Sequence, residues 1–275
     1  MKKKKITSAV ITLILIIAGC VSLFPVYVAV INSMKSNKDM MQSILGMPSQ
    51  FHFENFAKAI EKLDFLKSTA NTFYLTVLAV AGIILFSSLA GYKLARTNNK
   101  LSKFIYVLFV ASMLIPFHSI MISLTKVSMV VGSKGSLTGL ATIYIGLGLN
   151  MAVFLYVGFV KSIPLEIEEA AIVDGAGPFS TFFLIVFPLL KPITATIMIL
   201  DALWAWNDFL LPLLMITDSD KYTLILSASV FFGKYSADWT ALLAGLLMTS
   251  VPMVIFYLIF QKHIVKGVAA GAIKG

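Results

Sequence analysis

The chain has 275 residues, of which 59% are hydrophobic and only 13% are charged. A soluble domain carries about 25% charged residues, so this composition excludes a soluble globular protein and indicates an integral membrane protein. The net charge of +9 at pH 7 does not indicate nucleic-acid binding, because the sequence contains no basic patch interleaved with aromatic residues.

Long apolar segments nearly free of charge recur along the chain, and each reaches the roughly 20 residues that a helix needs to cross about 30 Å of hydrocarbon. Helices also satisfy their own backbone hydrogen bonds in lipid. The sequence therefore predicts an all-α membrane protein with six transmembrane helices in a single domain over residues 1–275. The predicted spans are about Ile6–Met34, Ser68–Tyr92, Phe104–Thr125, Gly135–Val160, Ile193–Thr217 and Thr240–Gln261.

The first predicted span contains Cys20, which follows small residues in the way that a lipid-modified cysteine follows a lipoprotein signal. A signal has an apolar core of about 7–15 residues and then polar sequence. Here the apolar run continues through Val21–Ile31, which favours a retained membrane helix over a cleaved signal. Cys20 is the only cysteine, so an internal disulfide is excluded.

The basic residues are distributed unevenly between the segments that join the spans. Lys2–Lys5 and the short segment Lys93–Lys103 carry basic residues and no acid, whereas the long segment 33–67 offsets its lysines with acids. Positive charge accumulates on the cytoplasmic side of membrane proteins. The sequence therefore predicts that both termini are cytoplasmic.

A polar segment of about residues 161–192 separates the fourth and fifth predicted spans, and it predicts a short helix at about 164–174. A proline suits the first turn of this helix, and the acids that follow it favour the positive N-terminal end of the helix dipole. Gly175 is a natural stop. Two to three turns of helix are therefore expected to project from the membrane.

The surface of this helix favours contact with a partner. Ala170 and Ala171 leave it shallow enough for close packing in a groove, and the neighbouring carboxylates can meet basic residues there. Thr181–Leu190 is apolar but too short to span, and Pro188 with Pro192 is expected to bend its entry into the next span. An ordinary solvated loop is the alternative, and it is the spacing of the residues rather than their charge that favours a docking helix.

The spacing resembles the cytoplasmic EAA loop of bacterial ABC importer permeases, in which Glu-Ala-Ala, a glycine four residues after the second alanine, and a distal Ile-x-Leu-Pro recur. The matching residues are Glu169, Ala170, Ala171, Gly175, Ile185 and Pro188. Only Phe187 departs from the pattern, where leucine is usual. The resemblance implies the ABC importer permease fold, with a coupling helix that docks on a cytoplasmic ATPase. The residues that it assigns to coupling are Glu169, Ala170, Ala171, Asp174, Gly175 and Pro188.

Later segments are similar to permeases for sugars, and specifically to the second permease subunit of maltose-type importers. These segments are Trp206–Leu213, Tyr222–Leu224, Gln261–Lys262 and Gly267–Gly275. The resemblance implies an ATP-driven, binding-protein-dependent importer of a mono- to oligosaccharide. An ABC permease for an amino acid or a peptide is the alternative, and the C-terminal tail with the segment Trp206–Asp208 favours sugar.

The same resemblance implies a set of partners around a multi-pass protein of the bacterial cell membrane. These are a second, homologous permease subunit, two ATPase subunits that bind ATP and Mg²⁺, an extracytoplasmic sugar-binding protein and membrane lipid, without nucleic acid. The outer loop at about 218–239 is expected to reach the binding protein, and the cytoplasmic tail at 262–275 is expected to lie near the ATPase.

Polar residues within the fifth predicted span suggest a second site. Asp201, Trp204 and Asp208 recur at helical spacing on one face, with Asn207 beside it. Carboxylates in a membrane span usually face the protein interior or water. This face could line a sugar path, because tryptophan rings stack on sugars and carboxylates bond hydroxyls. Helix packing with interfacial tryptophan anchoring explains the same residues equally well.

Catalytic motifs are missing from the sequence. It has no G-x-x-x-x-G-K-[ST] loop for nucleotide phosphates, and its histidines His52, His118 and His263 have no second ligand at metal spacing. Gly175-Ala176-Gly177 lacks the strand and third glycine of a dinucleotide site. A secondary transporter is disfavoured because no inverted repeat is found. The sequence thus predicts a transporter subunit that is not an enzyme and holds no cofactor of its own.

Overall fold

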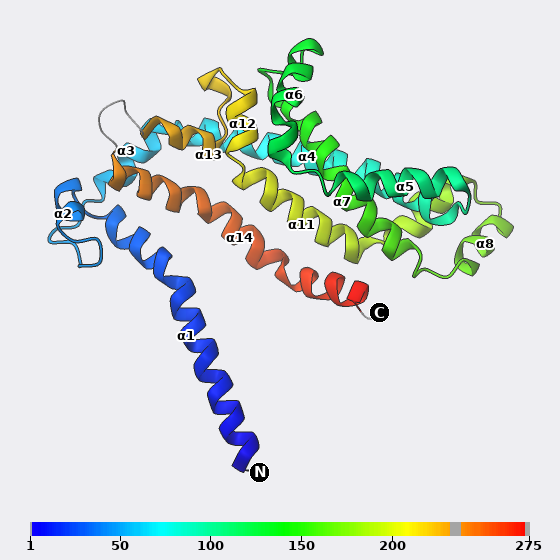
Figure 1. Ribbon diagram of the computed structural model, residues 1–275, viewed down its shortest axis with the longest axis horizontal. Coiled ribbons are helices and arrows are strands. Elements are labelled where there is room, and N and C mark those ends of the chain that lie inside the picture. The colour runs from blue at the N-terminus through cyan, green and yellow to red at the C-terminus, as the bar shows by residue number, and fades with distance from the viewer. Residues whose placement is uncertain (1, 232–237, 273–275) are drawn as a thin grey trace. The chain divides into compact units, whose positions relative to one another are not determined.

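A computed structural model describes residues 2–231 and 238–272, and this part of the chain contains helices and no strands (Figure 1). It divides into two compact units. Unit one comprises residues 1–66 and 227–252, and unit two comprises residues 67–226 and 253–275.

Four helices contain stretches that are long and apolar enough to cross a membrane within the described part of the chain. They are α1 (Lys2–Ser33), α4 (Phe65–Arg96), α7 (Leu137–Val160) and α14 (Trp239–Ala272). Two bent helix pairs bring the number to six if each pair counts as one span. The prediction of an all-helical membrane protein is therefore confirmed.

The third predicted span, Phe104–Thr125, is wrong as a single straight helix. The structure has α5 (Lys100–Ser112) and α6 (Phe117–Val130), which meet at 105°. Pro116 lies at the break with an extended backbone, φ −62° and ψ 135°, and it caps the start of α6. Proline has no N–H to donate, and it disfavours helical backbone in the residue before it, so the helix ends ahead of Pro116.

The fifth predicted span is also interrupted. Helix α11 (Lys191–Asn207) ends before Asp208, whose backbone is extended, and the chain resumes as the short helix α12 (Leu210–Met215). The Asp208 carboxylate accepts the Leu210 N–H at 2.9 Å, which satisfies a donor that a continuing helix would have paired with an earlier carbonyl. The spacing predicts that Asp208 shares a helical face with Asp201 and Trp204. This prediction is wrong, because Asp208 lies outside α11.

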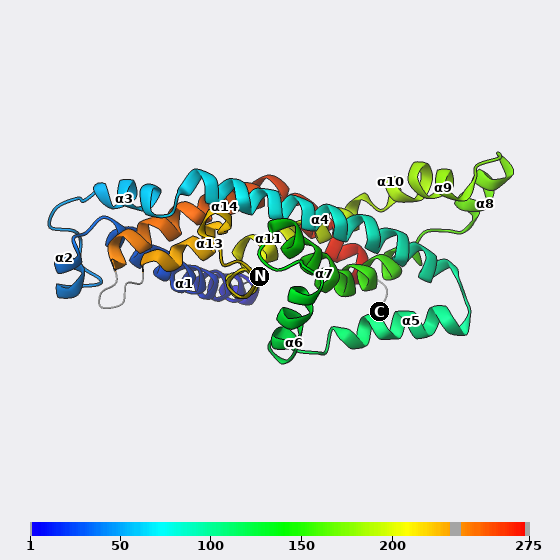
Figure 2. The ribbon, with the colours of Figure 1, turned by 90° about the horizontal axis from the view of Figure 1, so that it is seen from above.

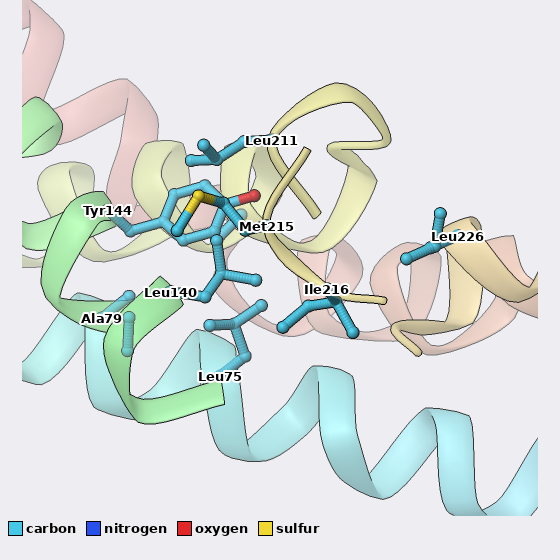
Figure 3. Close-up of a cluster of buried hydrophobic side chains, with 10 residues drawn as sticks. Leu75, Ala79, Leu140, Tyr144, Leu211, Met215, Ile216 and Leu226 are labelled. Atoms are coloured by element: carbon cyan, nitrogen blue, oxygen red, sulfur yellow. The ribbon is translucent and has the colours of Figure 1, made fainter. Parts of the chain in front are cut away.

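The core of unit two is built on α4 and α7. Leu75 and Ala79 of α4 pack with Leu140 and Tyr144 of α7, and Met215 of α12 joins the same buried cluster (Figure 3). A second buried cluster lies farther along both helices and includes Ile83, Tyr156, Phe182, Val186 and Ile197.

The two helices approach each other closely near the end of α4. A Cβ added at Gly91 would lie 2.6 Å from the Tyr156 Cβ and 3.4 Å from the Val157 backbone nitrogen. Only glycine leaves room for the α7 backbone at this point.

Unit one holds α1, α2 (Asn37–Gln42), α3 (Glu54–Lys62) and the first part of α14. Lys35 is 1% exposed, and its ammonium donates to the Asn32 Oδ1 at 3.1 Å and the Ser43 carbonyl at 2.7 Å. Asp238 precedes α14 and accepts hydrogen bonds from Asn37 and Lys62. Burial raises the pKa of Asp238, but hydrogen bonds from Asn37, the Ala241 N–H and Lys62 outweigh it and leave the pKa lowered.

The orientation of the chain in the membrane is a prediction that cysteine labelling can check. In a Cys20→Ser background, a cysteine at Asn98 is expected to be protected from an impermeant thiol reagent in sealed cells, and one at Ser219 is expected to react. Both native side chains are exposed in the structure, so access in permeabilised cells provides the control. Labelling at Asn98 before permeabilisation would reverse the predicted orientation.

Candidate coupling helix and membrane pocket

The helix expected at about 164–174 is α8 (Glu166–Val173). It ends in a Schellman motif, in which the Gly175 N–H donates to the Ile172 carbonyl at 3.0 Å and the Ala176 N–H donates to the Ala171 carbonyl at 2.9 Å. Gly175 has φ +86°, the left-handed conformation that this motif requires at its glycine. The predicted stop at Gly175 is confirmed.

The two alanines of α8 lie on different faces. Ala171 is 5% exposed and packs within the chain, whereas Ala170, Glu169 and Asp174 are exposed. The prediction that both alanines form one shallow docking surface is wrong for Ala171. A period of 3.6 residues turns consecutive side chains about 100° apart, so adjacent alanines on a short helix that rests on the protein must divide in this way.

The segment after α8 lies against it at one end of unit two (Figure 2). It consists of α9 (Pro178–Ser180), the π-helical η1 (Thr181–Val186) and α10 (Phe187–Leu189). Phe182 and Val186 are buried, and Pro188 is exposed. The segment meets α11 at an angle of 75°, as expected from a short apolar run that prolines bend into the next span.

Glu168 lies in the first turn of α8 and is buried, and the sequence predicted no partner for it within the chain. It is 4% exposed, and its carboxylate accepts the Arg96 Nε–H at 2.7 Å and the Tyr92 hydroxyl at 2.7 Å. Tyr92 and Arg96 lie four residues apart, on one face at the end of α4. The four-residue spacing of Tyr92 and Arg96 was the only feature of the sequence that indicated a shared partner for these two donors.

A pocket of about 620 Å³ lies in unit two, bordered by the break between α5 and α6, by α7 and by the end of α11. Its polar and aromatic lining consists of Ser112, Phe117, His118, Asn150, Trp204 and Asp208. Trp204 is 38% exposed, so its ring is accessible from the pocket. Pockets that hold small molecules have volumes of about 300–1,000 Å³, with mostly apolar walls and a few polar groups.

Tyr144 fixes the position of the polar wall of the pocket. Its hydroxyl donates to the Asp208 Oδ2 at 2.7 Å, and its ring meets the Trp204 ring edge to face at 5.0 Å. Asp208 also accepts the Leu210 N–H through its other oxygen. Because the tyrosine is fully buried among the residues of Figure 3, it holds both pocket residues in place.

The remaining residues of the predicted polar face lie elsewhere. The half-buried Asp201 faces α7, where its Oδ1 would be 3.6 Å from a Cβ added at Gly148. Asn207 is exposed and donates to the Leu203 carbonyl of its own helix at 2.8 Å. The structure therefore brings Trp204 and Asp208 together at the pocket and separates them from Asp201 and Asn207.

Other helices bring further residues to this pocket that were not predicted from the sequence. Phe117 and His118 follow the break at Pro116, and Asn150 belongs to α7. A polar amide inside a long apolar segment is a signal for Asn150, because such groups in a span usually face protein or water. Within residues 2–231 and 238–272, no group of three or more His, Cys, Asp or Glu side chains could hold a metal ion.

The outer loop expected at 218–239 contains η2 (Ser219–Lys221), α13 (Leu224–Ser227) and η3 (Ala228–Phe231), and residues 232–237 lie outside the described part. Asp220 forms an ion pair with Lys67 at 2.7 Å. The backbone of the tail expected at 262–275 is helical to Ala272, its side chains are not described, and residues 273–275 lie outside the described part.

Residues 83–270 match the model of a family described as binding-protein-dependent transport system inner membrane component. The chain is 36% identical over 276 residues to the probable starch degradation products transport system permease protein of Thermoanaerobacterium thermosulfurigenes, covering 100% of both chains. It is 38% identical to the melibiose/raffinose/stachyose import permease protein of Bacillus subtilis (strain 168), covering 97% of this chain and 96% of that one.

A solved structure has a similar fold. It is the crystal structure of a bacterial ABC transporter involved in the import of the acidic polysaccharide alginate, with a TM-score of 0.79 and 22% sequence identity. The alignment covers 95% of this chain and 98% of that chain.

Proposed function

The chain belongs to the family of binding-protein-dependent transport system inner membrane components, and from that membership we propose that it forms half of the path by which an ATP-driven importer carries a sugar. It is a multi-pass membrane permease subunit of an ABC transporter and not an enzyme. The observation that carries the sugar assignment is the full-length similarity to permeases named for starch degradation products and for melibiose, raffinose and stachyose.

The partners follow from this assignment. Permeases of this family work with a second permease, an ATPase and a binding protein. We assign ATP and Mg²⁺ to two cytoplasmic ATPase subunits, because the sequence has no nucleotide loop of its own. The exposed side of α8, with Glu169, Ala170 and Asp174, is assigned to ATPase contact, and the segment 218–239 is assigned to contact with the binding protein. Both termini, including the tail at 262–275, are assigned to the cytoplasm.

The pocket is assigned to the sugar path. The Trp204 ring offers an apolar face to a sugar ring, and Asp208 and Asn150 offer hydrogen-bonding groups to its hydroxyls. Polar groups within a membrane span are costly unless they meet protein, water or a substrate. Asp201 and Asn207 are assigned to helix packing and to the helix surface, because neither lines the pocket.

The test is uptake by the complete transporter. In cells or vesicles that contain both permeases, the ATPases and the loaded binding protein, Trp204→Ala is expected to lower sugar uptake by up to about tenfold, since it removes a ring contact worth about 0.5–1.5 kcal/mol. Trp204→Phe keeps a ring beside Tyr144 and should retain more uptake. Asn207→Ala is the matched control, because Asn207 lies on the same helix, outside the pocket.

Two results would contradict the proposal. If Trp204→Ala assembles normally and its uptake kinetics are unchanged, the pocket is not part of the sugar path. If the binding protein purified with the complex carries an amino acid or a peptide, the proposed substrate class is wrong.

A further inference from the structure

The buried carboxylate of Glu168 joins the coupling helix to the end of α4. Its Oε1 lies 2.6 Å from the Arg96 Nη2 and accepts the Nε–H at 2.7 Å, and its Oε2 accepts the Tyr92 hydroxyl at 2.7 Å. Both carboxylate oxygens are therefore bound by donors from a single face of α4. A charge-assisted hydrogen bond from a guanidinium to one carboxylate oxygen and a hydroxyl bond to the other fix the orientation of the carboxylate as well as its distance from α4.

The same arginine reaches two further segments of the chain. Its Nη2 donates to the Ile163 carbonyl at 2.9 Å, just beyond the end of α7. The Tyr92 ring packs on the Phe182 ring of η1, with the centroids 5.1 Å apart. Gly91, the residue before Tyr92, lets α4 approach α7 closely at Tyr156. The ends of α4 and α7, the start of α8 and η1 thus meet around Glu168.

The burial of this pair distinguishes Glu168 from the next residue. Glu168 is 4% exposed, and the Arg96 side chain is 18% exposed in the ion pair. Glu169 is exposed and remains accessible to a partner. A buried ion pair is strongly destabilised when one member is removed, because the other charge is left uncompensated. The two adjacent glutamates therefore have separate tasks, one inside the chain and one outside it.

We propose that Glu168 is the positioning residue that passes movement of the coupling helix to α4 through Arg96 and Tyr92. α8 also packs against η1, where Ala171, Thr181 and Phe182 are buried. Apolar contacts of this kind are non-directional, whereas the hydrogen bonds that Arg96 and Tyr92 donate to Glu168 are directional. When the ATPase displaces α8, the pair moves the end of α4 with it. The inference rests on the proposed function, since it presupposes an ATPase that acts on α8.

The experiment measures sugar transported per ATP hydrolysed by the complete, reconstituted transporter. Glu168→Leu and Arg96→Met are each expected to lower this ratio by about tenfold or more, since each removes the ion pair and leaves the other member without its charged partner. The double variant Glu168→Leu/Arg96→Met should recover much of the ratio, because packed apolar side chains can replace a buried ion pair. Lys93→Met is the matched control, an exposed basic residue on the same turn of α4.

Tyr92→Phe gives a second measurement that does not depend on the leucine and methionine variants assembling. It keeps the ring against Phe182 and removes only the hydrogen bond to Glu168. A smaller fall in the same ratio is expected. An unchanged ratio in Tyr92→Phe and in every single variant that assembles would overturn the proposal.

A contact between Glu168 and the ATPase would have a different signature. In that case Glu168→Leu would lose ATPase association in a pull-down, Arg96→Met would not, and the double variant would not recover; this outcome overturns the proposal. The ratio can be measured with whichever solute the wild-type complex imports. Failure of the wild-type complex to import a sugar would therefore contradict the proposed substrate and leave this test intact.

Discussion

Gly175→Leu is expected to abolish sugar uptake while the permease still inserts in the membrane. Gly175 has φ +86°, and a side chain in left-handed backbone costs about 1–2 kcal/mol. Nothing lies within 4 Å of a Cβ built at this position, so the strain comes from the backbone rather than from a clash within the chain. The eight-residue helix α8 would lose the Schellman hydrogen bonds that end it. The measurements are uptake and ATPase pull-down with purified complexes.

Gly175→Asn is the matched control for this prediction. Asparagine is the residue other than glycine most often found at this position of a Schellman motif, because it tolerates left-handed backbone. It adds a side chain of similar length to leucine, so a much milder effect is expected if the backbone is decisive. Normal uptake and hydrolysis in Gly175→Leu would contradict the role of α8 as a coupling helix.

The predictions that succeeded are those that depend on local sequence. The apolar runs of α1, α4, α7 and α14 needed only a count of residues against membrane thickness. The helix α8 and its stop needed only local acids and a glycine. In each case the signal lies within a single run of neighbouring residues.

The two interrupted spans show where local reading failed. Pro116 was visible in the sequence, but hydrophobicity alone was counted across it, and the helix breaks there by 105°. The end of α11 at Asn207 was not visible. Tyr144, 64 residues away, donates to the Asp208 carboxylate, and such a tertiary contact cannot be read from a single sequence.

The candidate sites follow the same pattern. Trp204 and Asp208 were predicted as one helical face, and they do meet, but only because the chain leaves the helix between them and α5, α6 and α7 complete the pocket. The Glu168–Arg96 pair joins residues 72 positions apart. Many acids and bases in this chain could have paired, and only the packed structure selects this one.

Ala170→Asp and Ala171→Asp are expected to fail in different ways, although the residues are neighbours. Ala171 is 5% exposed and buried within unit two, so an aspartate there would be an unpaired charge in the interior, which costs several kcal/mol. The yield of assembled permease pair is expected to fall sharply. Ala170 is exposed, and an aspartate there should leave insertion and permease pairing intact.

The separate readouts are the amount of purified permease pair, the ATPase retained on it and the sugar imported. Ala170→Asp should give a normal amount of permease pair with less ATPase bound and little import, because a charge is introduced where close packing is proposed. Ala170→Ser is the control, since it adds a small neutral group at the same place. Normal ATPase retention by Ala170→Asp would remove this face of α8 from the contact. Wild-type yield of Ala171→Asp would contradict the buried packing of α8 against η1, on which the direction of the whole coupling helix depends.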